Sequence, residues 1–437
     1  MILVFLVIVI FFITISISKG KIHPFLVLLL AGLVMGYAAG LGTNEVIKRI
    51  TDGFGSTLSS IGIVIASGTI IGTFLEKSGG AQSVAEFVLK KIGEKKSILA
   101  MSITGFIVSI PVFCDSGFVI LSPLTKALSK KTGASLVTLS IALATGLYAT
   151  HVFVPPTPGP LAAAATLGAD IGLVLILGLI VAVPTTAAGY FWAKYFCRKY
   201  HIDLENKLTE EKKILPKASS AFAPLLVPII FISLKSIADY PTHPFGQNFL
   251  KEFIDFFGHP VVALLIGVVL SFFLKDKKIK ESNFSWVSIG LKEAGTIILI
   301  TGAGGAFGNV LRAANLGDTV SSSLSNWPIG IFFPFLIAAV LKSAQGSSTV
   351  ALITTAAIMV PLLNMLGLAS PIAKALVVLA IGAGSMTVSH LNDSYFWVVS
   401  QFSNMDTSIA LKTHTTATLL QGITGIIFIF FLKLIFV

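Results

Sequence analysis

The chain has 437 residues, of which 54% are hydrophobic and only 12% are charged, and its mean hydropathy is +0.91. Soluble domains carry about 25% charged residues, so this composition excludes a soluble globular protein and predicts an all-α polytopic membrane protein. The net charge of +11 lies in short loops between apolar runs, which argues against nucleic-acid binding and is typical of cytoplasmic loops.

Several windows approach the roughly 20 apolar residues that cross a bilayer as a helix. In chain order they are 1–18, 24–41, 57–75, 170–196, 221–238, 259–274, 291–311, 371–388 and 416–436. Residues 1–56 are therefore expected to form N-terminal transmembrane helices, the first of them retained because it lacks a secretory cleavage site. The two cysteines, Cys114 and Cys197, give no metal spacing, and we expect neither a metal nor a cofactor.

The next region, residues 57–196, contains two interruptions. Residues 97–131 have basic loops at both ends but only about one and a half spans of apolar sequence, broken by "PVFCDSG". If both ends are cytoplasmic, the segment enters the membrane, turns at "CDSG" (114–117) and returns as a re-entrant hairpin with its tip near mid-membrane. Four prolines then fall within "THVFVPPTPGPLAA" (150–163), and no continuous helix survives them.

A charged stretch at 197–220 predicts a cytoplasmic linker, and residues 221–290 are expected to hold connecting transmembrane helices with an external loop at 239–258. Residues 291–437 then repeat the plan of 57–196. A second hairpin is expected at 328–366, with its tip at "KSAQGSST", and a second broken helix at "SHLNDSYFW" (389–397).

The two regions correspond in order and spacing. The matched pairs are Gly68 with Gly304, Gly72 with Gly308, His151 with His390, and Asp170 with Asp406. Lysines are abundant in 76–97 and 126–133, whereas the equivalent stretches 312–327 and 362–373 hold only Arg312. Because basic loops face the cytoplasm, the sequence predicts two repeats of inverted topology. Broken helices at such an interface mark the binding site of a secondary transporter.

Polar residues at the two predicted tips are candidates for that site. Asp115 is an ionisable group at mid-membrane depth, where such groups are usually functional, although it could instead cap a helix from Gly117. Ser116, Gly117, Ser347 and Ser348 offer hydroxyls and free N–H groups at helix N-termini, which suit an anionic substrate, or they serve small-residue packing.

The broken helices carry further candidates. His151 and His390 recur at equivalent positions and either shuttle protons, bind hydroxyls or make structural hydrogen bonds. Asn392, Asp393 and Ser394 form a polar surface for a substrate or a proton. Lys342 precedes the second tip and could neutralise a substrate carboxylate, pair with Asp115 or Asp393, or snorkel to the interface.

Three long motifs resemble the gluconate permease family of bacterial proton symporters, and the resemblance covers essentially the whole chain. They are "IPVFCDSGFVIL", "THVFVPPTPGPLAAA" and "GSMTVSHLNDSYFW". The resemblance implies a homodimeric protein of the bacterial cytoplasmic (inner) membrane that takes up a sugar acid or related hydroxy acid by an elevator movement. Positions inside its motifs add Pro155 and Thr157 to the substrate-site candidates.

The expected function is proton-coupled uptake of gluconate or a related small hydroxylated carboxylate, with Asp115 or Asp393 as the proton carrier and no covalent chemistry. A sodium-coupled carboxylate or dicarboxylate symporter is the near alternative. The distant alternative is an intramembrane enzyme that uses Ser116 or Cys114 with His151.

Overall fold

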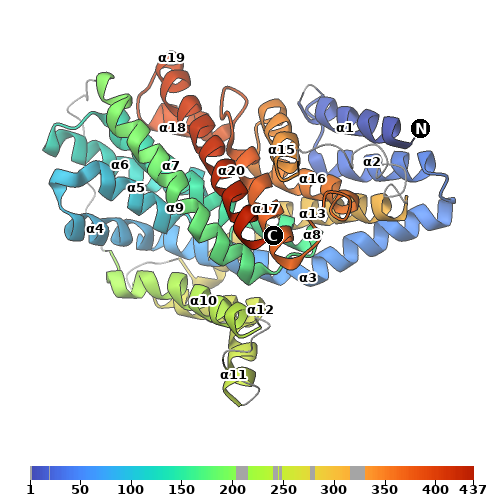
Figure 1. The fold of residues 1–437 in the computed structure, drawn as a ribbon. Helices are drawn as coiled ribbons and strands as arrows, with labels where there is room; N and C mark the ends of the chain where they lie inside the picture. Colours follow the sequence, from blue (N-terminus) through green and yellow to red (C-terminus); the bar gives the residue numbers. More distant parts are fainter. Residues whose placement is uncertain are drawn as a thin grey trace.

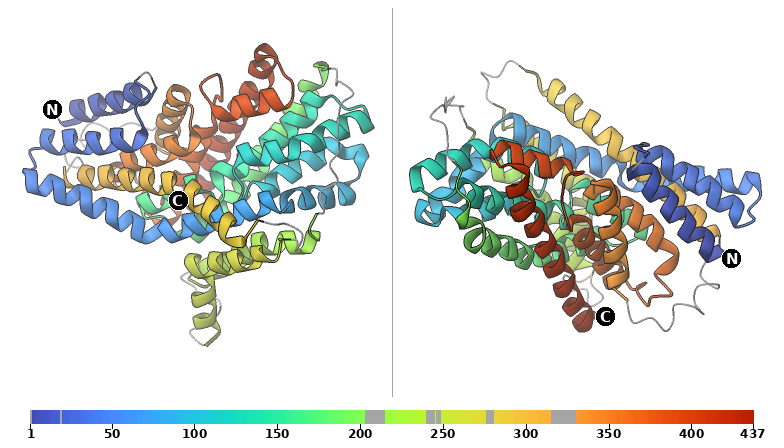
Figure 2. Two further views of the ribbon diagram at one scale, coloured as in Figure 1. Left: turned by 180° about the vertical axis from the view of Figure 1, so that it is seen from behind. Right: turned by 90° about the horizontal axis from the view of Figure 1, so that it is seen from above.

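The structure is a computed structural model that describes residues 2–18, 20–202, 215–239, 245, 249–275, 281–314 and 330–437. Over these residues the regular secondary structure is entirely helical. Six described helices are long and apolar enough to cross a membrane, or seven if the bent pair α11 and α12 forms one span. Figures 1 and 2 show an elongated molecule with α1 (Ile2–Ser18) and α2 (Pro24–Ala38) at one end and α4, α5 and α6 at the other.

Two long helices, α3 (Thr43–Lys77) and α13 (Asn283–Ala313), pack side by side along the molecule. Small residues allow the close approach: a Cβ on Gly53 would lie 2.6 Å from the carbonyl oxygen of Gly305. Both helices run through positions where the sequence predicts a region boundary, at 56/57 and 290/291, although glycines lie beside each position.

The predicted first hairpin region is a helix, a turn and a second helix. After α4 (Gly80–Ile92) and a 3-10 turn (Glu94–Lys96), α5 (Ser97–Val108) is followed by a break at 109–113 and then α6 (Cys114–Thr132). At about 1.5 Å per residue, the 12 residues of α5 span too little to cross a bilayer alone. The exposed ion pair Lys131–Glu94 at 2.6 Å joins the two ends of this unit.

The second hairpin region has a shorter break. Helix α15 (Phe332–Gln345) and α16 (Ser348–Met359) are separated only by Gly346 and Ser347, and a 3-10 turn (Val360–Leu362) follows. Gly346 has φ +84, a left-handed conformation that favours glycine. Residues 328 and 329 of the predicted hairpin lie outside the described residues.

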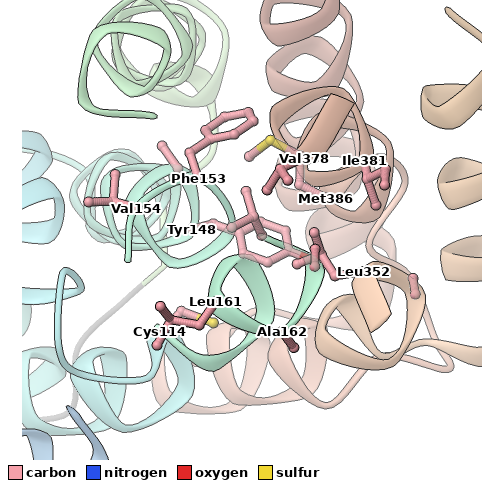
Figure 3. Packing of buried hydrophobic residues seen from close by; sticks show 14 of the residues in the cluster. Cys114, Tyr148, Phe153, Val154, Leu161, Ala162, Leu352, Val378, Ile381 and Met386 are labelled. Atoms are coloured by element: carbon pink, nitrogen blue, oxygen red, sulfur yellow. The ribbon is translucent and has the colours of Figure 1, made fainter. Parts of the chain in front are cut away.

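Both predicted broken helices are interrupted in the structure. The proline-rich stretch ends α7 (Leu136–Phe153) and restarts as α8 (Pro158–Leu167) after a break that contains the cis peptide Pro155–Pro156. Similarly, α17 (Pro371–Met386) ends before residues 387–393, and α18 (Ser394–Phe402) follows. Figure 3 shows buried side chains of α6, α7, α8, α16 and α17 packed together at the centre of the molecule.

Each region closes with a long helix that begins at an aspartate cap. Asp170 accepts a hydrogen bond from Leu173 N at 2.7 Å and opens α9 (Ile171–Tyr195), which a 3-10 turn (Cys197–Lys199) follows. Asp406 accepts one from Ile409 N at 2.7 Å and opens α19 (Thr407–Ala410). A π-helical turn, η4 (Leu411–Thr415), leads from α19 into α20 (Thr416–Phe436), and α9 packs against α20.

Between the two regions lie α10 (Ala218–Ala238), α11 (Phe249–Gly258) and α12 (Pro260–Phe272). Helices α11 and α12 meet at an angle of 65°, and α11 projects from the body in Figure 1. The predicted external loop at 239–258 therefore contains a helix. Residues 203–214 of the predicted linker, and 240–244 and 246–248 of this loop, lie outside the described residues.

Candidate functional site

Each of the four chain breaks ends at a helix N-terminus, and these N-termini meet. The four helices are α6, α8, α16 and α18. The Asp115 carboxyl of α6 lies beside the Ser394 side chain of α18. A Cβ on Gly159 of α8 would lie 3.8 Å from Thr349 Cα of α16. Because helix N-termini present unpaired N–H groups and a positive dipole end, their meeting favours an anion.

Tyr148 of α7 joins these pairs. Its ring centroid lies 5.1 Å from that of Tyr395 and 6.4 Å from that of His151. Its hydroxyl lies beside Ser348, and the ammonium of Lys342 lies 5.9 Å from its ring centroid. Tyr148 therefore contacts residues of both the 57–196 region and the 291–437 region, and α6, α16 and α18 all place a first-turn residue near it.

A buried ion pair lies at the same place. Lys342 Nζ of α15 is 2.5 Å from Asp393 Oδ2, and the two side chains are 1% and 5% exposed. Lys342 also donates to the carbonyl oxygen of Gly346 at 2.5 Å. Asp393 Oδ1 accepts a hydrogen bond from Tyr395 N at 3.1 Å, so this carboxylate caps α18. Of the alternatives for Lys342, the structure shows pairing with Asp393.

A second layer of polar residues supports Asp393. Ser389 donates its hydroxyl proton to Asp393 Oδ2, and His414 Nε2 lies 3.2 Å from the same hydroxyl oxygen. Since the hydroxyl proton is committed to Asp393, His414 Nε2 acts as the donor in this contact. Thr415 Oγ1 donates to Ser389 O at 2.5 Å, and Ser389 N donates to Thr418 Oγ1 at 3.0 Å. Both N–H and C=O of Ser389 are therefore held by the π-turn and α20.

The three predicted residues of the first tip, Asp115, Ser116 and Gly117, have different surroundings in the structure. Helix α6 begins at Cys114, so Asp115 lies in its first turn and does not cap a helix from Gly117. Asp115 is half-buried, and its Oδ1 has no hydrogen-bond partner among the described residues. Ser116 is half-buried, whereas Gly117 is buried and a Cβ there would lie 2.8 Å from Leu147 Cδ2. Gly117 therefore serves helix packing.

The first broken helix is fully enclosed. His151, Pro155 and Thr157 are buried, and the Thr157 hydroxyl donates to Val154 O at 2.6 Å within the break. His151 lies close enough to Lys342 and Asp393 to interact with their charges, and its Nδ1 has no partner among the described residues. The structure thus brings His151 to the site but gives Pro155 and Thr157 a role in the turn.

The second tip and second break face each other. Ser347 caps α16 by accepting from Val350 N at 3.3 Å, and Ser348 is buried. His390 Nε2 and Asn392 Nδ2 lie 3.0 and 2.9 Å from the carbonyl oxygen of Ser343 in α15. Asn392 and Ser394 are exposed, so the polar surface is open on this side.

Sequence reasoning missed part of this cluster. Tyr148, Ser389, Tyr395 and His414 were not among the predicted residues. Tyr395 lies inside a motif that was singled out, and a tyrosine buried with its hydroxyl on Ala144 O at 2.8 Å could have been anticipated there. His414 reaches the site only through the π-turn, which no periodicity in the sequence indicates. Among the described residues, no group of three or more His, Cys, Asp or Glu residues could hold a metal ion.

The family profile described as GntP family permease matches residues 1–435. The chain belongs to this family. The permease is 37% identical to an uncharacterized permease of Haemophilus influenzae, over 92% of this chain and 86% of the relative. It is 35% identical to the gluconate permease of Pseudomonas aeruginosa, over 96% and 94%. It is 32% identical to the D-serine transporter DsdX of Escherichia coli K12, over 98% of each chain.

The fold of the GntP permease also matches a solved transporter. The crystal structure of the Alcanivorax borkumensis YdaH transporter has a TM-score of 0.68 and 15% identity, over 93% of this chain and 98% of that one. At this identity the likeness concerns the fold alone. Family and relatives together make the protein a multi-pass permease of the cytoplasmic membrane, and the enzyme alternative is wrong.

Proposed function

We propose that this permease imports gluconate or a related sugar acid in symport with a proton. The relatives named above are a gluconate permease and a D-serine transporter, and both substrates are small carboxylates that carry hydroxyl groups. The observation that carries the proposal is the meeting of the N-termini of α6, α16 and α18 near Tyr148 and Lys342, with the N-terminus of α8 against α16. Such a site binds a carboxylate through N–H groups and a cation.

The substrate would lie between the two tips and the two breaks. Helices α6 and α18 have their own carboxylates, Asp115 and Asp393, at their N-termini, whereas α16 begins with serines. The substrate carboxylate therefore suits the α16 end, near Ser347 and Ser348. Its hydroxyl groups suit the acceptors and donors around it: Asp115, Ser116, His390, Asn392 and Ser394.

The inverted repeats and the elevator movement are part of the proposal. Elements correspond pairwise along the chain: α3 with α13, α5 and α6 with α15 and α16, α7 and α8 with α17 and α18, and α9 with α20. Contacts correspond as well, since α6 packs on α18 and α16 packs on α8. In an elevator movement the hairpins and broken helices would carry the substrate as one body past α3 and α13.

Uptake of an anion against an inside-negative potential costs about 2.3 kcal/mol per charge per 100 mV, which a co-transported proton offsets. The test is counterflow and net uptake of labelled gluconate in proteoliposomes under an imposed pH or sodium gradient. We expect uptake to follow the pH gradient. Uptake that ignores the pH gradient and follows sodium would establish the sodium alternative instead.

A homodimer is proposed with this function, on the strength of the family resemblance. Light scattering with a correction for bound detergent would measure the mass of the purified protein. A mass close to twice 46.1 kDa is expected, and a mass of one chain would refute the dimer.

A further inference from the structure

Protein stability alone does not explain why the ion pair Lys342–Asp393 is buried. Both charges are removed from water, and the loss of hydration offsets much of their attraction, so buried ion pairs are replaceable by apolar residues at little cost. Removing only one partner, in contrast, leaves an uncompensated buried charge. A buried pair is therefore well suited to a switch in which one charge disappears and another replaces it.

The hydrogen-bond geometry leaves room for such a replacement. A lysine ammonium has three donors, and Lys342 uses one on Gly346 O and one on Asp393 Oδ2. The third N–H of the ammonium has no acceptor among the described residues. The ammonium lies over the ring of Tyr148, 5.9 Å from its centroid. Gly346 directly precedes Ser347 and Ser348, so Lys342 lies at the N-terminus of α16, where the proposed function places the substrate carboxylate.

We propose that Asp393 is the proton carrier, and that its protonation releases Lys342 to bind the carboxylate of the substrate. A proton from the outer water binds Asp393, and the substrate anion replaces the lost carboxylate charge beside Lys342. On the cytoplasmic side the substrate leaves, Asp393 gives up its proton, and the ion pair forms again. This inference rests on the proposed function and specifies its coupling step.

Charge balance enforces the coupling. In the empty state the pair Lys342–Asp393 carries no net charge, and in the loaded state the same pair with a neutral Asp393, together with the substrate anion, again carries no net charge; the charge of Asp115 is the same in both states. A site with the proton alone has one uncompensated positive charge, and a site with the substrate alone has one uncompensated negative charge. Both are disfavoured in a buried position, so proton and substrate bind together in a ratio of one to one.

Other groups face Asp393 from every element packed around it. On α6 these are Cys114 and Asp115, on α7 Tyr148 and His151, on α18 Tyr395, and on the π-turn His414, all close enough to interact with its charge. Of these, only Asp115 is a second carboxylate. It has no cation within ion-pair distance among the described residues, so its protonation would release none.

Electroneutral transport is the direct consequence. One substrate anion and one proton carry no net charge together, so a pH gradient of one unit supports up to about tenfold accumulation, and a membrane potential adds nothing. In wild-type proteoliposomes, accumulation of gluconate is therefore expected to stay constant when valinomycin and potassium vary the potential at a fixed pH gradient. Gluconate binding in weakly buffered detergent solution is expected to take up about one proton per substrate.

Variants assign the roles. Asp393→Asn keeps the α18 cap and imitates the protonated state, so gluconate binding should become independent of pH and take up no proton. Counterflow should persist while accumulation driven by a pH gradient is lost. Lys342→Gln should lower gluconate affinity at least about 30-fold. Asp115→Asn, in contrast, is expected to weaken binding but to leave the proton count at one.

The pair Lys235–Asp239 supplies a matched control. Its atoms lie 2.7 Å apart, but the side chains are 26% and 43% exposed and lie at the C-terminal end of α10. Lys235→Gln and Asp239→Asn should leave both the proton count and the pH dependence of uptake at wild-type values.

Several outcomes would overturn the inference while leaving the proposed function intact. They are accumulation that follows the membrane potential, wild-type affinity in Lys342→Gln, or accumulation driven by a pH gradient in Asp393→Asn. A wild-type proton count of zero would overturn the inference and the proton coupling of the proposed function together. If Asp393→Asn does not fold, Asp115→Asn decides: a proton count that falls to zero in that variant would assign the proton to Asp115 and overturn the inference. If gluconate and related sugar acids neither bind to nor stabilise the wild type against heat at any pH, the proposed function itself fails.

Discussion

Gly346 fixes how the second tip meets the second break. Its left-handed backbone, with φ +84, turns the chain between α15 and α16 and presents its carbonyl oxygen to Lys342. The space where a side chain would project is taken by the carbonyl oxygen of Asn392. The tip and the 387–393 break can touch only because residue 346 has no Cβ.

We expect Gly346→Ala to destabilise the protein more than Gly133→Ala. Both glycines have positive φ, +84 and +69, so alanine costs about 1–2 kcal/mol of backbone strain at either site. Nothing lies within 4 Å of a Cβ at 133, whereas a Cβ at 346 would collide with Asn392. Melting temperatures in detergent measure the difference. Equal decreases for the two variants would mean that the tip does not pack against the break as described.

Individual site residues could be predicted from the sequence where they lie together in one motif, and could not be predicted where they come from separate segments. Asp115 and Asp393 were predicted because a carboxylate in an apolar run needs a reason. The sequence left three roles open for Lys342, and only the distance to Asp393 in the structure selects one of them. The contact between Ser389 and His414 could not be predicted, because the π-turn at Leu411–Thr415 sets how the residues before α20 line up with the 387–393 break.

Helix α3 packs against both breaks of the region 57–196. A Cβ on Gly68 would lie 3.0 Å from Pro156 O, and one on Gly72 would lie 2.6 Å from Pro111 O. One glycine thus contacts the broken helix and the other contacts the first tip. Two positions a single helical turn apart hold both interruptions close to α3.

Substitutions within α3 test this arrangement. Gly72→Ala is expected to lower the free energy of unfolding, because the new Cβ would overlap the backbone oxygen of Pro111, which cannot move aside as a side chain can. Gly62→Ala is the matched control, since nothing lies within 4 Å of a Cβ there and alanine favours a helix by about 1 kcal/mol. Thermal unfolding should show a decrease for Gly72→Ala and no decrease for Gly62→Ala.

The breaks themselves were predictable as elements, for two separate physical reasons. Prolines at 155, 156, 158 and 160 exclude a continuous helix, and the structure ends α7 at Phe153. The first hairpin was inferred from too short an apolar length between basic loops, but the predicted turn at "CDSG" (114–117) is wrong: those residues open α6, and the break lies just before them at 109–113. Helices α3 and α13 pass through the predicted boundaries at 56/57 and 290/291 in spite of the glycines there, because a glycine inside a helix costs only about 1 kcal/mol, which helix packing offsets.

At the scale of the whole molecule, the proposed inverted repeats relate residues 57–196 to residues 291–437. The paired caps Asp170 and Asp406, each 2.7 Å from its backbone N–H, begin the last spans of the two regions. Lys131 directly precedes the end of α6, and Asn364 follows the equivalent unit, α16 with its 3-10 turn. If the halves are inverted, these two positions lie on opposite sides of the membrane although they occupy equivalent places in the repeats.

Single cysteines at these two positions distinguish inverted from parallel repeats. Lys131 and Asn364 are both exposed, and the native Cys114 and Cys197 are buried, so the background reaction with a membrane-impermeant maleimide is expected to be low. Lys131→Cys loses only an exposed ion pair, worth about 1 kcal/mol or less. Because lysines mark the cytoplasmic side, we expect Asn364→Cys to be labelled in intact cells and Lys131→Cys only after permeabilisation. Labelling of both from the same side would require parallel repeats, and two tips entering from one side could not give alternating access by exchanging equivalent conformations of the two halves.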